Sequence, residues 1–294
     1  MNGGKSNDSK ATVVRRTVSL EPLHCELLMG YESEVPDFAR RLTVRHRHCV
    51  WWHILSGTVS VRTVDESVPD RAEAGAGATI FIAPGTLRVH RFSPDARLVS
   101  VHFSVEAADG RPLFPALPLI LWPPGDAADA MVDAARRLVG RIGAGRGRAG
   151  DLRTRGELYL FAAALLRALE SKGVAVDDGA AADLRLEAVL ADLRRDPRAG
   201  PLPYVRWTRL TGLGRSQLDR LCRRHCGESL RARRDGILMS RLERQLAADS
   251  RDIKALAYDH GFVDASHLTR WFRSQSGATP GAFRRALAGR DFGE

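Results

Sequence analysis

Between residues 20 and 105, apolar and polar positions alternate in several short runs, most clearly over 58–64, 78–82 and 98–105. A period of two puts every second side chain on the same face of a strand, so these runs predict β-strands. Closely spaced turn signals rich in Gly, Pro, Ser and Asp separate them. The pattern therefore predicts a small all-β barrel or sandwich.

After a proline-rich connector over residues 111–125, the apolar positions change to helical spacing. This spacing predicts helices over 126–142 and 152–170, with a loop rich in Gly and Arg at 143–150. The second helix carries more leucines than one buried stripe requires. Burial against a second copy of the chain and burial within one chain both explain the surplus.

The C-terminal part shows a pattern of paired short helices. Ile253, Leu256 and Ala257 form the apolar face of one helix, Gly261 ends it, and a second helix starts after Asp264 with small polar residues. This is the plan of a helix-turn-helix unit, whose second helix enters the major groove of DNA.

A similar pattern occupies residues 204–227, and a helix over 229–248 connects the two units. Its twenty or so residues would span about 30 Å, close to the roughly 34 Å of one duplex turn. One chain could thus present two recognition helices to adjacent segments of the major groove.

The net charge of +10 is concentrated in this region, because residues 183–294 hold 22 Lys and Arg against 14 Asp and Glu. A basic domain gathers near polyanions, so nucleic acid is the first partner to consider and an anionic membrane surface the second. The four cysteines form no disulfide framework, and neither a signal peptide nor an apolar run of about 18 residues is present. We expect a cytoplasmic protein that does not enter the membrane.

The second unit matches a longer motif, A-x(3)-GF-x(3)-S-x-L-x-R-x-F followed by G-x-T-P-x-x-F-R. It closely resembles the signature of the arabinose-regulator (AraC/XylS) family. The first unit fits this pattern at Leu218 and Arg220, with Gly214 where the family usually has Ser and Cys222 where it has an aromatic residue.

The resemblance implies which side chains face DNA. They are Arg215, Ser216, Asp219, Arg220 and Arg223 in the first unit, and Ala265, Ser266, His267 and Arg270 in the second. Arginine reads guanine or holds phosphate, while Ser and His can donate to either. Any one of them could instead belong to a solvated helix face.

The N-terminal half resembles a cupin-like sensor barrel in two segments, WHILSG at 52–57 and GATIFIAPG at 77–85. Enzymatic cupins hold a metal with H-x-H, a Glu and a later His. Although His46 and His48 form H-x-H, Val50 and Arg88 occupy the other two positions. We therefore expect no catalytic residue, metal or cofactor.

We expect the effector pocket instead among aromatic and polar-tipped residues near the barrel mouth. The candidates are Trp51, Trp52, His53, Arg88 and His90, although alternation must turn about half of them outward.

These patterns predict an α+β two-domain fold: a cupin-like β-barrel with two following helices, then an all-α double helix-turn-helix domain. The expected parts are a disordered N-terminus (1–16), the effector-binding and dimerisation domain (17–172), a linker (173–182) and the DNA-binding domain (183–290), with units at about 203–226 and 252–275.

The predicted function is sequence-specific transcription regulation under a small-molecule effector. The partners would be double-stranded promoter DNA, RNA polymerase, which the protein would position or block, and a second copy in a homodimer. Two alternatives stay open: a metal-dependent cupin enzyme tethered to a DNA-binding domain, and an architectural DNA binder without a ligand.

Overall fold

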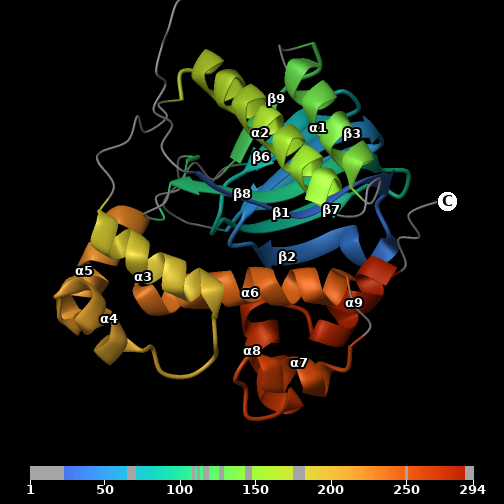
Figure 1. Cartoon of the computed structure of the whole chain (residues 1–294). Coiled ribbons are helices and arrows are strands. Elements are labelled where there is room, and N and C mark those ends of the chain that lie inside the picture. The colour runs from blue at the N-terminus through green and yellow to red at the C-terminus, as the bar shows by residue number, and fades with distance from the viewer. Residues whose placement is uncertain are drawn as a thin grey trace, which may run out of the picture.

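The computed structural model describes residues 23–64, 71–107, 110, 113–114, 119–125, 129–142, 148–174, 183–248 and 251–288. The expected disordered N-terminus and most of the expected linker lie outside these residues. A β-domain flanked by two helices is stacked on a layer of helices from the C-terminal part (Figure 1). The predicted α+β two-domain fold is confirmed.

The strands form two antiparallel sheets. The five-stranded sheet has the order β1-β8-β3-β6-β9, with β1 at Leu23–Glu34, β8 at Arg97–Ala107, β3 at Cys49–Ser56, β6 at Thr79–Ile82 and β9 at Leu119–Trp122. The four-stranded sheet has the order β2-β7-β4-β5, with β2 at Arg41–Arg45, β7 at Leu87–Phe92, β4 at Thr58–Thr63 and β5 at Arg71–Gly75. A 3₁₀ turn, Asp37–Ala39, precedes β2. Strands β4, β6 and β8 correspond to the three predicted runs.

The five-stranded sheet is buried on both faces. Trp52 and Ile54 of β3 point between the sheets, where they meet Val61 and Phe92 of the other sheet. Their neighbour Trp51 points to the opposite face and packs against Phe161. Consecutive residues of β3 thus serve two separate cores, as strand alternation requires.

Helices α1 (Asp129–Arg141) and α2 (Arg148–Ser171) cover the outer face of this sheet (Figure 1). Helix α2 begins inside the segment expected to be a loop. Strand β9 lies inside the expected connector, because its apolar side chains are buried along β6. A strand of four residues is too short to show a clear alternation of apolar and polar positions, so the sequence did not predict this edge strand.

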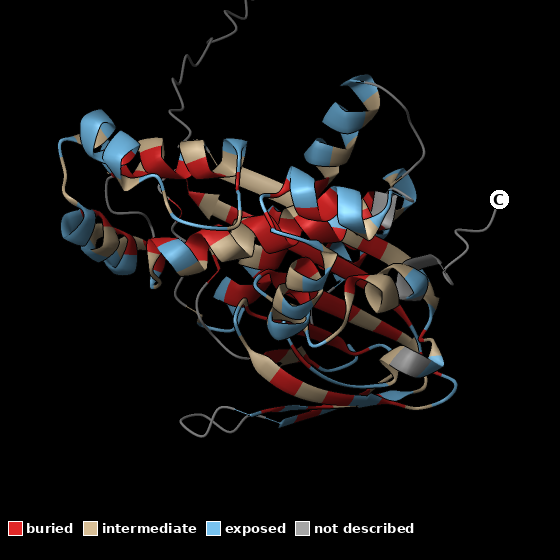
Figure 2. Ribbon diagram, turned by 90° about the horizontal axis from the view of Figure 1, so that it is seen from below, coloured by how far each residue is buried: buried red, intermediate tan, exposed pale blue. Residues whose placement is uncertain are grey.

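The C-terminal helices are α3 (Leu184–Arg195), α4 (Tyr204–Thr211), α5 (Arg215–Cys226), α6 (Leu230–Ala248), α7 (Ile253–Asp259), α8 (Ala265–Ser276) and α9 (Pro280–Ala288). They form two small cores. One surrounds Trp207 between α3, α4 and α5, and the other surrounds Phe272 between α7, α8 and the second half of α6. Figure 2 shows exposed residues on the outward faces of the helices and buried ones inside.

Helix α6 joins the two cores. It contributes Leu230 to the first and Leu238, Leu242 and Leu246 to the second. It also lies beneath β1 and β2, so the barrel rests on the helix that connects the two units (Figure 1). Among the described residues, no helix is long and apolar enough to cross a membrane.

Candidate functional site

The first helix-turn-helix unit consists of α4 and α5. The indole N–H of Trp207, a fully buried residue, donates to Asp192 of α3 at 2.8 Å. The hydroxyl of Tyr204 donates to Asp219 of α5 at 2.9 Å, and burial, followed by this contact, raises the pKa of Tyr204 to about 12. Helix α5 is therefore fixed against α4 by a hydrogen bond as well as by its apolar face.

The residues expected to face DNA on α5 differ in their surroundings. Arg215, Ser216, Arg220 and Arg223 are exposed. Asp219 is half-buried and already accepts the bond from Tyr204, whose ring also lies 4.9 Å from the Arg215 guanidinium. Asp219 thus has a structural contact that the sequence did not indicate.

The second unit consists of α7 and α8. Gly261 adopts φ 77° in the turn, and an added Cβ would lie 3.3 Å from the carbonyl oxygen of Ala199, so a larger residue would be both strained and crowded. Asp264 caps α8 by accepting a 2.6 Å bond from the backbone N–H of His267. The sequence-predicted start of the recognition helix is therefore fixed by its cap.

On α8, Ser266 and Arg270 are exposed, while Ala265 and His267 are half-buried. The His267 ring lies 5.2 Å from the ring of Phe262. Leu268 is buried on the inner side of the helix.

Helix α6 connects the cores of the two recognition helices: Leu230 at its start belongs to the core of α5, and Leu238, Leu242 and Leu246 further along it belong to the core of α8. The full length of its nineteen residues, at about 1.5 Å each, is roughly 28 Å. That length sets the upper limit of the spacing that α6 gives the two units along the duplex.

The residues expected to form the effector pocket are divided between two faces of the barrel. Trp51 and His53 lie on the face covered by α1 and α2, where His53 is hydrogen-bonded to Thr79 at 3.0 Å. Trp52, Arg88 and His90 come together on the other face.

In this second group, the Arg88 guanidinium lies 5.2 Å from the centroid of the Trp52 ring, and the ring of His90 packs edge-on to the same indole. Burial lowers the pKa of Arg88 to about 9 and that of His90 to about 3. Around them, buried apolar side chains between the sheets form a cluster.

A cavity of about 700 Å³ lies instead between the barrel and the DNA-binding domain. Its charged lining consists of Arg45, Arg47, Arg194, Arg233, Arg241, Arg244, Glu26, Glu106 and Glu228. Val105, Phe114 and Ile237 add an apolar wall. Sequence reasoning missed this cavity, because its residues come from strands and helices far apart in the chain.

Ion pairs cross the same interface. Glu106 of β8 accepts from Arg194 at 3.1 Å and also pairs with Arg233. Glu26 of β1 pairs with Arg244 of α6 at 2.6 Å, and burial raises the pKa of Glu26. The barrel is thus docked on the helical layer through carboxylates on strands and arginines on helices.

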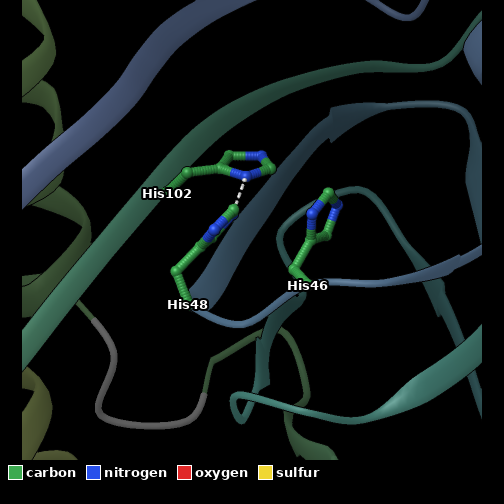
Figure 3. A group of neighbouring side chains, drawn as sticks. All are labelled: His46, His48 and His102. Atoms are coloured by element: carbon green, nitrogen blue, oxygen red, sulfur yellow. Dashed lines mark hydrogen bonds between the residues drawn. The ribbon is translucent and has the colours of Figure 1, made fainter. Parts of the chain in front are cut away.

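A group of three histidines lies beside this interface. His46 and His48 come from the turn between β2 and β3, and His102 comes from β8 (Figure 3). His48 Nε2 and His102 Nδ1 share a 2.9 Å hydrogen bond, and His48 Nδ1 lies 3.7 Å from the carboxylate of Glu243 on α6. The H-x-H pattern could have pointed here, but His102 and Glu243 gave no local signal.

Comparisons with known proteins agree with this architecture. Residues 207–286 match the family described as a helix-turn-helix domain. The crystal structure of an apo variant of ToxT from Vibrio cholerae has a TM-score of 0.56 at 14% identity, covering 93% of this chain and 100% of that one. A structure of ToxT bound to an unsaturated fatty acid has the same TM-score at 15% identity, covering 94% and 99%. A search of curated proteins gave no match.

The fold and its paired units define a two-domain DNA-binding transcription regulator. Its C-terminal region contains a helix-turn-helix domain over residues 207–286, which agrees with the resemblance found in the sequence.

Proposed function

We propose that this regulator binds promoter DNA through α5 and α8, and that an organic anion in the interdomain cavity controls it. The observation that carries the proposal is the cavity itself, with six arginines against three glutamates and an apolar wall. A pocket with an apolar body and a few convergent cationic groups suits an amphipathic carboxylate.

The location supports a regulatory role. Each cross-domain carboxylate, Glu26 or Glu106, is paired with an arginine of the helical domain. An anionic ligand would compete with these glutamates for the same guanidinium groups. It would therefore have different affinities for docked and separated domains, which is what a ligand needs to shift a conformational equilibrium.

The fatty-acid-bound ToxT, which shares the fold, makes a long-chain carboxylate a reasonable first probe. The proposed site differs from the pocket expected from the sequence. The residues between the sheets form an apolar cluster, whereas the interdomain cavity has both volume and charge.

The proposal retains the sequence-predicted DNA contacts, a homodimer, and an action on RNA polymerase at the promoter. A cavity with ligand-binding chemistry favours it over an architectural DNA binder. The cavity also favours effector control over a tethered enzyme. Its arginines and glutamates are engaged in ion pairs and do not form an acid–base or nucleophilic arrangement.

The experiment compares binding of oleate and of uncharged oleyl alcohol to the full-length protein by calorimetry. Oleate should bind at one site per chain and alter affinity for promoter DNA, and the alcohol should bind at least about tenfold more weakly because it lacks the carboxylate.

Arg45→Gln removes a cavity-lining charge and should weaken oleate binding by about tenfold. Arg62→Gln, which changes an exposed arginine on β4, is the matched control and should leave it unchanged. Equal affinity for the acid and the alcohol, or equal effects of the two variants, would refute the proposed site.

A further inference from the structure

We propose that His46, His48 and His102 form a binding site for a divalent transition-metal ion, with Glu243 of the DNA-binding domain as a positioning residue. The proposal goes beyond effector control by an organic anion, because it assigns a second ligand and a separate site.

The geometry of the three rings fits a metal. Their potential ligand atoms all lie within 4.8 Å of one another. Ring centroids are 4.6 Å apart for His46 and His48, 5.4 Å for His46 and His102, and 5.1 Å for His48 and His102. Tetrahedral coordination at about 2.05 Å per nitrogen would place such centroids about 5.2 Å apart. The centroid distances are therefore close to those of a metal site, and the side chains would have to turn so that their nitrogens converge on the ion.

One adjustment concerns His48 and His102. Their facing nitrogens are 2.9 Å apart and share a hydrogen bond (Figure 3), whereas two nitrogens on one tetrahedral ion lie about 3.3 Å apart. Opening this contact by about 0.4 Å would exchange one hydrogen bond for two metal bonds. A cavity of about 20 Å³ adjoins the group, enough space for one small ion or water. It is lined by the three rings, Glu243, Leu28, Met29 and Phe283.

Glu243 faces the second ring nitrogen of one proposed ligand, His48. His48 would bind the ion through Nε2, which leaves Nδ1 facing the Glu243 carboxylate at 3.7 Å. A carboxylate at the second nitrogen is the usual partner of a metal-bound histidine, because it fixes the tautomer and strengthens the ligand. Here that carboxylate belongs to α6, so the site spans both domains.

Arg88 is the charge that opposes a cation here. The site shares the H-x-H pair with enzymatic cupins but not their other two ligand positions, since Val50 is fully buried between the sheets and Arg88 stacks on Trp52. Its place at the domain interface suits regulation, because an occupied site would stabilise the docked arrangement.

The test uses the full-length protein without effector and Co²⁺ as a spectroscopic probe. Titration should give one Co²⁺ per chain, with visible absorption bands of a four-coordinate site and a higher Tm. X-ray absorption of the Co²⁺-loaded protein should show three imidazole ligands. Absence of stoichiometric binding, or a first shell without imidazole, would overturn the proposal.

Variants locate the site. His102→Gln should abolish stoichiometric binding and the Tm increase, whereas His53→Gln, which changes a half-buried histidine on the same barrel, should retain both. Glu243→Gln should keep the three-imidazole spectrum but weaken affinity by about 10- to 100-fold. Circular dichroism checks that each variant is folded. Unchanged Co²⁺ affinity in folded His102→Gln would contradict the site, whatever the outcome with oleate.

Discussion

The side chains on the two recognition helices differ in their exposure and in the contacts that they already make within the protein. Arg220 and Arg270 occupy the corresponding place in the two motifs and are both exposed. Asp219, by contrast, accepts the Tyr204 hydrogen bond, and the His267 backbone belongs to the cap of α8. Removing either arginine should therefore disturb binding alone, whereas changing Asp219 should also loosen α5 from α4.

We predict that Arg220→Ala and Arg270→Ala each cost about 1–3 kcal/mol of specific DNA binding. If the side chain reads a base, specificity at that position should relax; if it holds a phosphate, all sequences should weaken alike. Fluorescence anisotropy with operator variants measures this, and thermal unfolding should change by no more than about 0.5 kcal/mol because both residues are exposed. Wild-type binding in both variants would mean that the recognition helices are misassigned.

At the scale of single elements, the structure shows where many of the surplus leucines of α2 are buried. Leu158, Phe161 and Leu165 are buried against the barrel and α1, so much of the apolar surface belongs to an intramolecular core. Leu152 and Leu160 remain 67% and 56% exposed, although the apolar side chains on the inner face of the same helix are buried. This exposed pair is where a second copy would contact α2 in the expected homodimer.

Leu160→Glu should therefore weaken dimerisation by at least about tenfold, because it would place a charge in an apolar interface. Analytical ultracentrifugation at micromolar concentration measures the change. The control is Leu184→Glu on α3, which alters a leucine of similar exposure (76%) outside this helix and should leave the dimer intact. A wild-type monomer, or a dimer equally stable in both variants, would remove α2 from the interface.

At the scale of the whole molecule, the barrel and the C-terminal helices are in close contact. Gly110 adopts φ 83°, and an added Cβ would lie 2.4 Å from Leu190 of α3 and 3.0 Å from the Cys226 sulfur. Arg47 donates to Glu228 at 3.2 Å, next to the end of α5, and to Gln275 of α8 at 3.3 Å. One barrel residue therefore contacts both helix-turn-helix units. Displacement of the barrel would break a contact at each of them.

At this scale, we expect a fragment comprising residues 183–294 to bind promoter DNA but to lose any response to oleate. If it neutralises six to ten phosphates, its affinity should fall by about 10³- to 10⁵-fold between 50 and 200 mM salt. Anisotropy titrations at several salt concentrations, each with and without oleate, test both points. Binding that ignores salt would contradict the DNA assignment, and an effector response in the fragment would contradict the interdomain site.

Much of this architecture follows from local sequence. Alternation over 98–105 predicted β8, and the positions of Leu256, Gly261, Leu268 and Phe272 predicted α7, the turn and α8. These signals are strong because periodic burial acts within a few residues of chain. Short segments were harder: β9 depends on pairing with β6, and the first turn of α2 carries no apolar stripe to mark it.

The chain by itself therefore determined the two domain types and the DNA-binding units, because strand alternation, helical periodicity and turn chemistry are encoded by near neighbours. Only the tertiary structure decided where small ligands could bind. It decided that Trp51 packs under α2 while Trp52 packs between the sheets. It also brought His102 and Glu243 to the H-x-H pair and gathered arginines against Glu26 and Glu106. Such groupings join residues many positions apart, and the packing of one domain on the other fixes them.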